Sequence, residues 1–161
     1  WLVGPWEPRL KALCGNCCLP TYAGIHREQM LHCFPNFVPG LHQYGDTPDI
    51  AALIAPRPLH LNFGELDGGS PIDEVRRGIE TIRKAYQSMH AEKSFTWFIE
   101  EKTGHVLSEK MWGKVKEFFS DFDQFPYQAG STLNPSGISY GLLQQQGAMK
   151  RLKELESLAP R

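Results

Sequence analysis

The stretch PLHLNFGELDGGSPIDEVRRGIETIRKAY, residues 58–86, decides the fold of this chain. It begins with a short apolar segment, continues through a glycine-rich loop, and ends in a sequence with helical periodicity. Pro71 suits a first helical turn, and Asp73 and Glu74 suit the positive end of a helix dipole. Apolar residues then recur at intervals of three and four: Ile72, Val75, Ile79, Ile82 and Tyr86. The pattern predicts a strand over 58–63 and a helix from Pro71 to about His90.

The neighbouring segments continue this alternation. Asp46 or Thr47 can cap a preceding helix that ends before Pro56, and the aromatic-rich segment 94–99 predicts another strand. Ser108 can cap a following helix, whose predicted core face consists of Met111, Trp112, Val115, Phe118 and Phe119. A further strand is predicted over 9–19 and a short helix within 22–33. Helices that alternate with strands predict an α/β fold, in which helices flank a parallel sheet.

Two loops follow the predicted strands 58–63 and 94–99, and they contain Asp67 and His105. The carboxyl ends of neighbouring parallel strands meet at one edge of the sheet, where ligands bind. A carboxylate can hold an imidazole in one tautomer, and the imidazole can then take a proton from a Ser or Cys nucleophile. Asp67 and His105 are therefore the candidate catalytic pair.

The composition limits the classes of partner. The 161 residues include 17 Lys and Arg against 18 Asp and Glu, which gives a net charge of −1. Nucleic-acid binding needs a surplus of basic residues, and a membrane span needs about 20 apolar residues. We therefore expect neither a nucleic acid nor a membrane as partner. The predicted α/β region ends near residue 122, and a linker over 123–139 and an amphipathic helix over 140–161 are expected to follow.

The four cysteines leave two alternatives open. Cys14 and Cys17, with His26 and Cys33, loosely match the spacing of zinc ligands. Alternatively, Cys14, Cys17 and Cys18 are free thiols in a buried strand, where cysteine behaves as a small hydrophobe. The second C-x2-C pair of many structural zinc sites is absent from the sequence, so we expect free thiols, no metal and no cofactor. Free thiols favour a reducing compartment.

Several segments resemble the dienelactone hydrolase and acetyl-xylan-esterase-like branch of the α/β-hydrolases. The resemblance covers about residues 1–122 and corresponds to the C-terminal half of that fold. It is carried by PWEPRLKA (5–12), DTPDIAALIAPRPL (46–59), GELD (64–67) with Pro71 after it, and TGH (103–105). The resemblance implies a carboxylic-ester hydrolase in which Asp67 orients His105, His105 is the general base, and the substrate is a small-molecule or glycan ester.

The sequence departs from that family at the nucleophile. The family's Ser lies in a Gly-x-Ser-x-Gly elbow that precedes the acid. Two segments come near this pattern, GNCCL (15–19) and, within the acid loop, GGSPI (68–72), but both lack the final Gly. We therefore expect a hydrolase fold truncated before the elbow, with the Ser upstream of Trp1, an incomplete triad and an inactive fragment.

Two other functions remain as alternatives. One is an enzyme of the dienelactone hydrolase type with Cys17 as nucleophile, and the other is a non-catalytic, hydrolase-like interaction domain. A parallel sheet cut at this point would expose an edge strand. Self-association through that edge, or through the helix over 140–161, is therefore expected as a further interaction.

Overall fold

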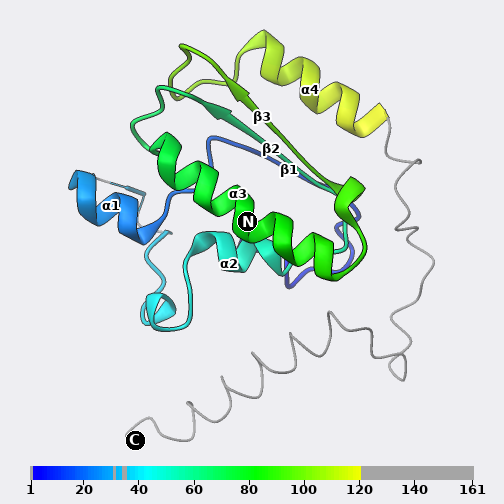
Figure 1. Cartoon of the computed structure of the whole chain (residues 1–161), viewed down its shortest axis with the longest axis horizontal. Helices are drawn as coiled ribbons and strands as arrows, with labels where there is room; N and C mark the ends of the chain where they lie inside the picture. Colours follow the sequence, from blue (N-terminus) through cyan, green and yellow to red (C-terminus); the bar gives the residue numbers. More distant parts are fainter. Residues whose placement is uncertain (1, 31, 34–35, 121–161) are drawn as a thin grey trace, which may run out of the picture. The chain divides into compact units, whose positions relative to one another are not determined.

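A computed structural model of the chain describes residues 2–30, 32–33 and 36–120. They form a three-stranded parallel sheet in the order β1-β2-β3, with β1 at Leu13–Asn16, β2 at Leu59–Gly64 and β3 at Phe95–Glu100. Helices α2 (Thr47–Ala52) and α3 (Ile72–Ser88) cover one face of the sheet, and α4 (Glu109–Ser120) covers the other (Figure 1). The predicted fold class, a parallel sheet flanked by helices, is confirmed.

Shorter helices connect these elements: α1 (Tyr22–Glu28), η2 (Leu41–Gln43) and η3 (Glu92–Ser94). The N-terminus of α2 forms as the sequence predicts. The Asp46 carboxylate accepts the N–H of Thr47 at 2.7 Å, and the Asp49 carboxylate accepts the N–H of Asp46, also at 2.7 Å. This reciprocal capping satisfies amide donors that the first turn of a helix leaves unpaired.

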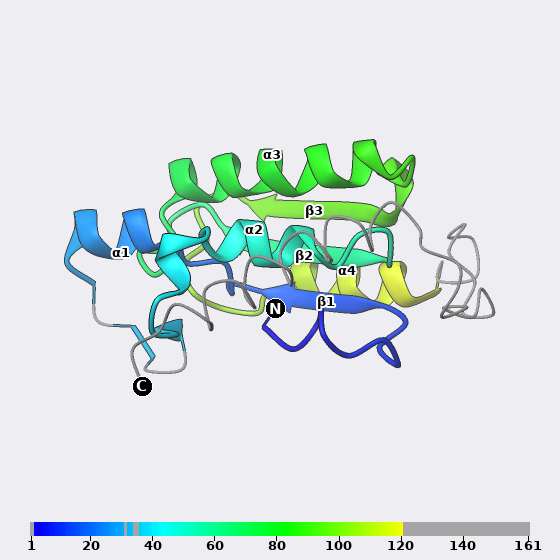
Figure 2. The same ribbon diagram turned by 90° about the horizontal axis from the view of Figure 1, so that it is seen from below.

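Strand β2 lies between β1 and β3, so both its edges are hydrogen-bonded (Figure 2). Apolar and polar side chains alternate along β2, because successive residues of a strand point to opposite faces of the sheet. Leu59, Leu61 and Phe63 belong to the apolar core. His60 stacks on Phe118 of α4 at a ring-centroid distance of 5.5 Å, and the Asn62 side chain donates to the Met111 carbonyl at 3.3 Å. Burial lowers the pKa of His60 and so favours the neutral ring at this packed position.

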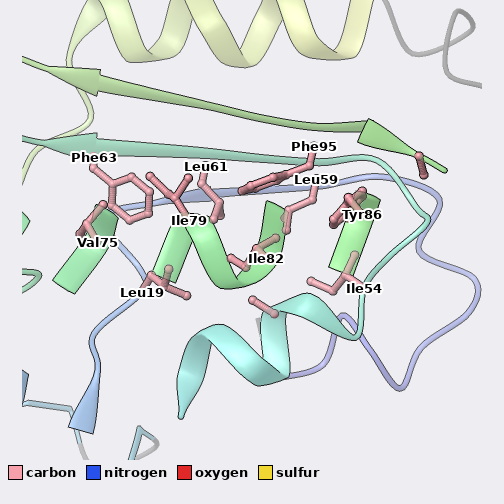
Figure 3. Close-up of a cluster of buried hydrophobic side chains, with 12 residues drawn as sticks. Leu19, Ile54, Leu59, Leu61, Phe63, Val75, Ile79, Ile82, Tyr86 and Phe95 are labelled. Atoms are coloured by element: carbon pink, nitrogen blue, oxygen red, sulfur yellow. The ribbon is translucent and has the colours of Figure 1, made fainter. Parts of the chain in front are cut away.

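The core lies between the sheet and the helices α2 and α3 (Figure 3). The predicted stripe of α3 supplies much of it, since Val75, Ile79, Ile82 and Tyr86 are all buried. Ile54, which follows α2, and Leu19, which follows β1, pack into the same cluster. Burial of this apolar area is the main favourable contribution to folding.

The opposite helix differs in part from the prediction. Met111, Val115 and Phe118 of α4 are buried, but Trp112 and Phe119 are 50% and 49% exposed. The two groups lie on adjacent sides of the helix, since one residue advances the helical position by about 100°. The predicted core face of α4 was therefore too wide in the described part of the chain.

The first strand is shorter than predicted, with only the four residues of β1. At its C-terminal end the left-handed residue Cys17, with φ of 49°, stops the strand. At its N-terminal end the buried side chain of Arg57 explains the difference. Its guanidinium donates to the main-chain carbonyl of Gly4 at 2.5 Å and to those of Glu7 and Leu10 at 3.0 Å. These charge-assisted hydrogen bonds occupy the three carbonyls and hold the chain there in a non-strand conformation.

Tyr86 permits a direct test of this packing. Its side chain is fully buried, stacks on Phe95 and donates its hydroxyl to the Arg57 carbonyl at 2.5 Å. Tyr86→Phe should lower the free energy of unfolding by about 1 kcal/mol, because it leaves that carbonyl without this donor. Urea denaturation measures the change, and Tyr44→Phe at a 49% exposed position is the control, with an expected change within about 0.5 kcal/mol. Equal effects of the two substitutions would contradict the prediction.

Residues 121–161 lie outside the described part of the chain. The predicted boundary near 122, the linker over 123–139 and the helix over 140–161 therefore stay predictions. Among the described helices, none has the length and apolar character needed to cross a membrane.

Candidate active site

The loops after β2 and β3 are joined by their main chains. The N–H groups of Glu65 and Leu66 donate to the carbonyls of Glu100 and Thr103 at 2.9 and 2.8 Å. Gly64, the last residue of β2, packs so closely against the other loop that a Cβ there would overlap the carbonyl oxygens of Thr103 and Gly104. Backbone contacts thus fix the distance between the loops that carry Asp67 and His105.

Asp67 and His105 form a hydrogen-bonded pair across this junction. Nδ1 of His105 lies 2.9 Å from Oδ2 and 3.1 Å from Oδ1 of Asp67. The Asp67 side chain is completely buried, whereas that of His105 is 66% exposed. The N–H of Gly69 also donates to Oδ1 of Asp67 at 2.8 Å. A buried carboxylate needs such donors because burial without them is costly.

This geometry fixes the tautomer of His105. A carboxylate only accepts hydrogen bonds, so Nδ1 carries the proton and Nε2 presents its lone pair. No described residue hydrogen-bonds Nε2. A neutral imidazole oriented in this way can take a proton from a nucleophile and return it to a leaving group. The structure therefore brings together the two residues that the sequence predicted as a catalytic pair.

A third side chain, that of Cys17, approaches the pair from β1. Its Sγ, a carboxylate oxygen of Asp67 and a ring nitrogen of His105 all lie within 4.8 Å of one another. Cys17 directly follows β1 and has a left-handed backbone conformation with φ of 49°, while its N–H donates to the Asn62 carbonyl at 2.8 Å. The left-handed turn is uncommon for a non-glycine residue. No sequence pattern indicated that Cys17 lies beside Asp67.

The environment of Cys17 is unfavourable for a nucleophile. Burial raises the pKa of the thiol, and the nearby Asp67 charge raises it further. The thiol donates to the Val106 carbonyl at 3.7 Å. Since the thiolate is the reactive form, a raised pKa lowers reactivity at neutral pH.

The other nucleophile considered in the acid loop, Ser70, is buried at 1% exposure, and its hydroxyl has no partner among the described residues. A complete Gly-x-Ser-x-Gly does occur later in the chain, as Gly137-Ile138-Ser139-Tyr140-Gly141. The prediction that the chain lacks a complete motif was therefore wrong. This motif follows His105 instead of preceding Asp67, which is not the order in which the family carries its nucleophile and acid. The segment before it, STLNPS (131–136), lacks the apolar strand that leads into an elbow. These residues lie outside the described part of the chain.

The zinc set suggested by spacing is not assembled. Among the described residues, Cys14, Cys17, His26 and Cys33 do not come together as a group of ligands. Cys14 is on β1, where burial raises the pKa of its thiol to about 11. His26 is on the exposed side of α1, and Cys33 is exposed. None of the four cysteines forms a disulfide; Cys14, Cys17 and Cys18 are partly buried, and Cys33 is exposed.

His32 is a site neighbour that no sequence pattern indicated. Its Nε2 lies 2.8 Å from the Gly69 carbonyl, and Asn36 contacts its Nδ1 at 3.2 Å. The Tyr22 hydroxyl donates to the Asn36 carbonyl at 2.8 Å. Nε2 of His32 therefore donates to the acid loop, and its Nδ1 accepts from the Asn36 amide. These contacts tie His32 and Asn36 to the loop that holds Asp67.

Neither a family model nor a curated protein sequence matches this chain, whereas several solved structures resemble it. A glucuronoyl esterase of carbohydrate esterase family 15 from Caldicellulosiruptor kristjansonii has a similar structure, with a TM-score of 0.59 and 14% sequence identity over 86% of this chain. The chain carries part of the α/β-hydrolase fold.

Two further structures share this hydrolase fold. The protein TT1662 from Thermus thermophilus matches 75% of the chain at 20% identity and a TM-score of 0.56. A glucuronoyl esterase from Solibacter usitatus matches 74% at 15% identity and a TM-score of 0.54. The matches cover 44%, 48% and 38% of the esterase from Caldicellulosiruptor, TT1662 and the esterase from Solibacter, respectively. The chain thus spans less than half the length of each of these three structures.

Proposed function

We propose that Asp67 and His105 are the acid and the base of a carboxylic-ester hydrolase, with a nucleophile that these 161 residues do not supply. The observation that carries the proposal is the 2.9 Å contact between Nδ1 of the exposed His105 and the fully buried carboxylate of Asp67. A buried acid, an oriented imidazole and a free Nε2 are the parts that general-base activation of a hydroxyl requires.

In the proposed reaction, Nε2 of His105 accepts the proton of a serine hydroxyl as the serine oxygen attacks the ester carbonyl. Asp67 stabilises the imidazolium that results. His105 then donates this proton to the departing alcohol, which leaves an acyl-enzyme. Water attacks the acyl group in the second half of the reaction, with His105 again as the base.

The substrate class rests on two lines of support. The motifs at 64–67 and 103–105 resemble those of dienelactone and acetyl-xylan-ester hydrolases, and two proteins of similar fold are named glucuronoyl esterases. Both point to the carbonyl of an ester, in a small molecule or on a glycan. We propose this class as the substrate.

Cys17 is disfavoured as an alternative nucleophile because its thiol is held in the protonated form. It lies near Asp67 and donates to the Val106 carbonyl, and burial holds its pKa above the usual value. Since the thiolate is the reactive form, this thiol is a poor nucleophile at neutral pH.

The 161-residue chain by itself should not hydrolyse esters. Its rate on p-nitrophenyl acetate should equal that of its His105→Ala variant, because removing the base has no effect where no nucleophile is present. Turnover that His105→Ala abolishes would contradict the proposal that the nucleophile lies outside the chain. Parallel assays of Ser139→Ala, Ser70→Ala and Cys17→Ser would then identify the nucleophile by the variant that is also inactive.

A further inference from the structure

The cluster at the edge of the sheet contains more than a hydrolase pair requires. Cys17 follows β1, Asp67 follows β2 and His105 follows β3, so neighbouring strands each contribute one side chain to it. A sulfur, a carboxylate oxygen and a ring nitrogen lie within 4.8 Å of one another. We propose that Cys17, Asp67 and His105 form a binding site for Zn²⁺.

The donor atoms match the preferences of zinc. Zn²⁺ binds Cys sulfur, His nitrogen and Asp oxygen, and three protein ligands leave a fourth tetrahedral position for water. Mg²⁺ and Ca²⁺ instead take six or more oxygen ligands, which three side chains with one carboxylate do not provide. The softer thiolate ligand further selects zinc over these hard cations.

The spacing is close to that of a filled site. Bonds of about 2.0–2.3 Å at tetrahedral angles put neighbouring donor atoms about 3.5 Å apart. The three donor atoms lie within 4.8 Å of one another, so they have to approach by about 1 Å to bind the metal. Because the His105 side chain is 66% exposed and Asp67 is fixed by Gly69, the histidine ring and the Cys17 thiol are the groups that move.

Charge also balances in the filled site. The Cys17 thiol loses its proton to solvent and its hydrogen bond to the Val106 carbonyl. The Nδ1 proton of His105 is replaced by the metal, and the neutral ring carries its proton on Nε2 instead. One thiolate and one carboxylate then neutralise the two positive charges of Zn²⁺. A neutral complex lowers the cost of placing a cation beside a buried acid.

Zinc binding has a consequence that rests on the proposed function. When the metal occupies Nδ1, the proton on Nε2 prevents His105 from accepting a proton from a nucleophile. Zn²⁺ would therefore inhibit ester hydrolysis reversibly, and a chelator would restore it. The binding itself requires no catalytic activity, so it is tested separately.

The test is isothermal titration calorimetry of the 161-residue chain with ZnCl₂. One ion should bind per chain, and Cys17→Ser or His105→Ala should each weaken binding by about 100-fold or more, since even outer-shell partners change affinity by up to about 100-fold. Cys33→Ser and His26→Ala are matched controls that should bind like the parent chain. Circular dichroism of each variant verifies that it is folded.

Cobalt(II) supplies a second measurement. A thiolate-to-cobalt charge-transfer band should appear with the parent chain and be lost in Cys17→Ser but retained in Cys33→Ser. Absence of binding, or binding that Cys17→Ser leaves unchanged, would overturn the proposed site. Loss of binding in Cys33→Ser and His26→Ala would assign the metal to the set that sequence spacing suggested. Neither result depends on whether the chain belongs to an active esterase.

Discussion

Asp67→Asn should lower kcat of the complete hydrolase, including its nucleophile, by about 10⁴-fold. The asparagine fits the same space, and its carbonyl oxygen can still accept the N–H of Gly69. Its NH₂ group, however, donates towards Nδ1 of His105, which moves the histidine proton to Nε2. The base then has no lone pair for the nucleophile, although every residue of the site is in place.

Steady-state kinetics on an activated ester measure this loss, and thermal unfolding verifies that the variant is folded. The control is Asp73→Asn, which removes a half-exposed carboxylate that pairs with Arg27 away from the reacting pair. It should retain nearly full kcat. A decrease of less than 10-fold in Asp67→Asn would remove Asp67 from the proposed triad, since an orienting acid has a much larger effect.

Gly64→Ala should destabilise the described fold by about 3 kcal/mol, the upper part of the usual range for overpacking. A Cβ at this position would overlap the carbonyl oxygens of Thr103 and Gly104. Both obstacles are main-chain atoms, so no side-chain rotation can relieve the overlap. The loops after β2 and β3 have to separate, and the hydrogen bond between Leu66 and Thr103 is expected to lengthen or break.

Chemical denaturation in urea gives the change in the free energy of unfolding, and Gly113→Ala is the matched control. Gly113 lies within α4 and has no atom within 4 Å of an added Cβ. Alanine there should raise stability by up to about 1 kcal/mol, because it is the better helix former. If Gly64→Ala were as stable as the parent chain, the close approach of the two loops would be wrong.

Much of the fold could be predicted because, over residues 46–100, the spacing of apolar residues and the residues that begin and end helices indicate the same elements. Asp46 caps α2, the stripe of α3 is buried, and β2 and β3 lie within one residue of their predicted positions. The contact between Asp67 and His105 followed from topology, since parallel neighbouring strands bring their final loops together. These features depend on local sequence and sheet order.

Other features depend on long-range geometry that local patterns do not contain. Cys17 reaches the pair through a left-handed residue after β1, and a non-glycine residue gives no sequence signal for that conformation. His32 meets Gly69 from a segment without periodicity. The extra length predicted for β1 was wrong because the distant Arg57 binds the carbonyls of Gly4, Glu7 and Leu10 at one end. At the other end the left-handed Cys17 stops the strand.

The main-chain junction between the loops also bears on how this site could change during evolution. The hydrogen bonds of Glu65 and Leu66 to Glu100 and Thr103 use backbone atoms only. The side chain at an exposed position such as Glu101 can therefore be replaced without changing the path that places His105 beside Asp67. The geometry of Asp67 and His105 therefore does not depend on the exposed side chains around them. Those side chains can change towards different substrates while the pair is preserved.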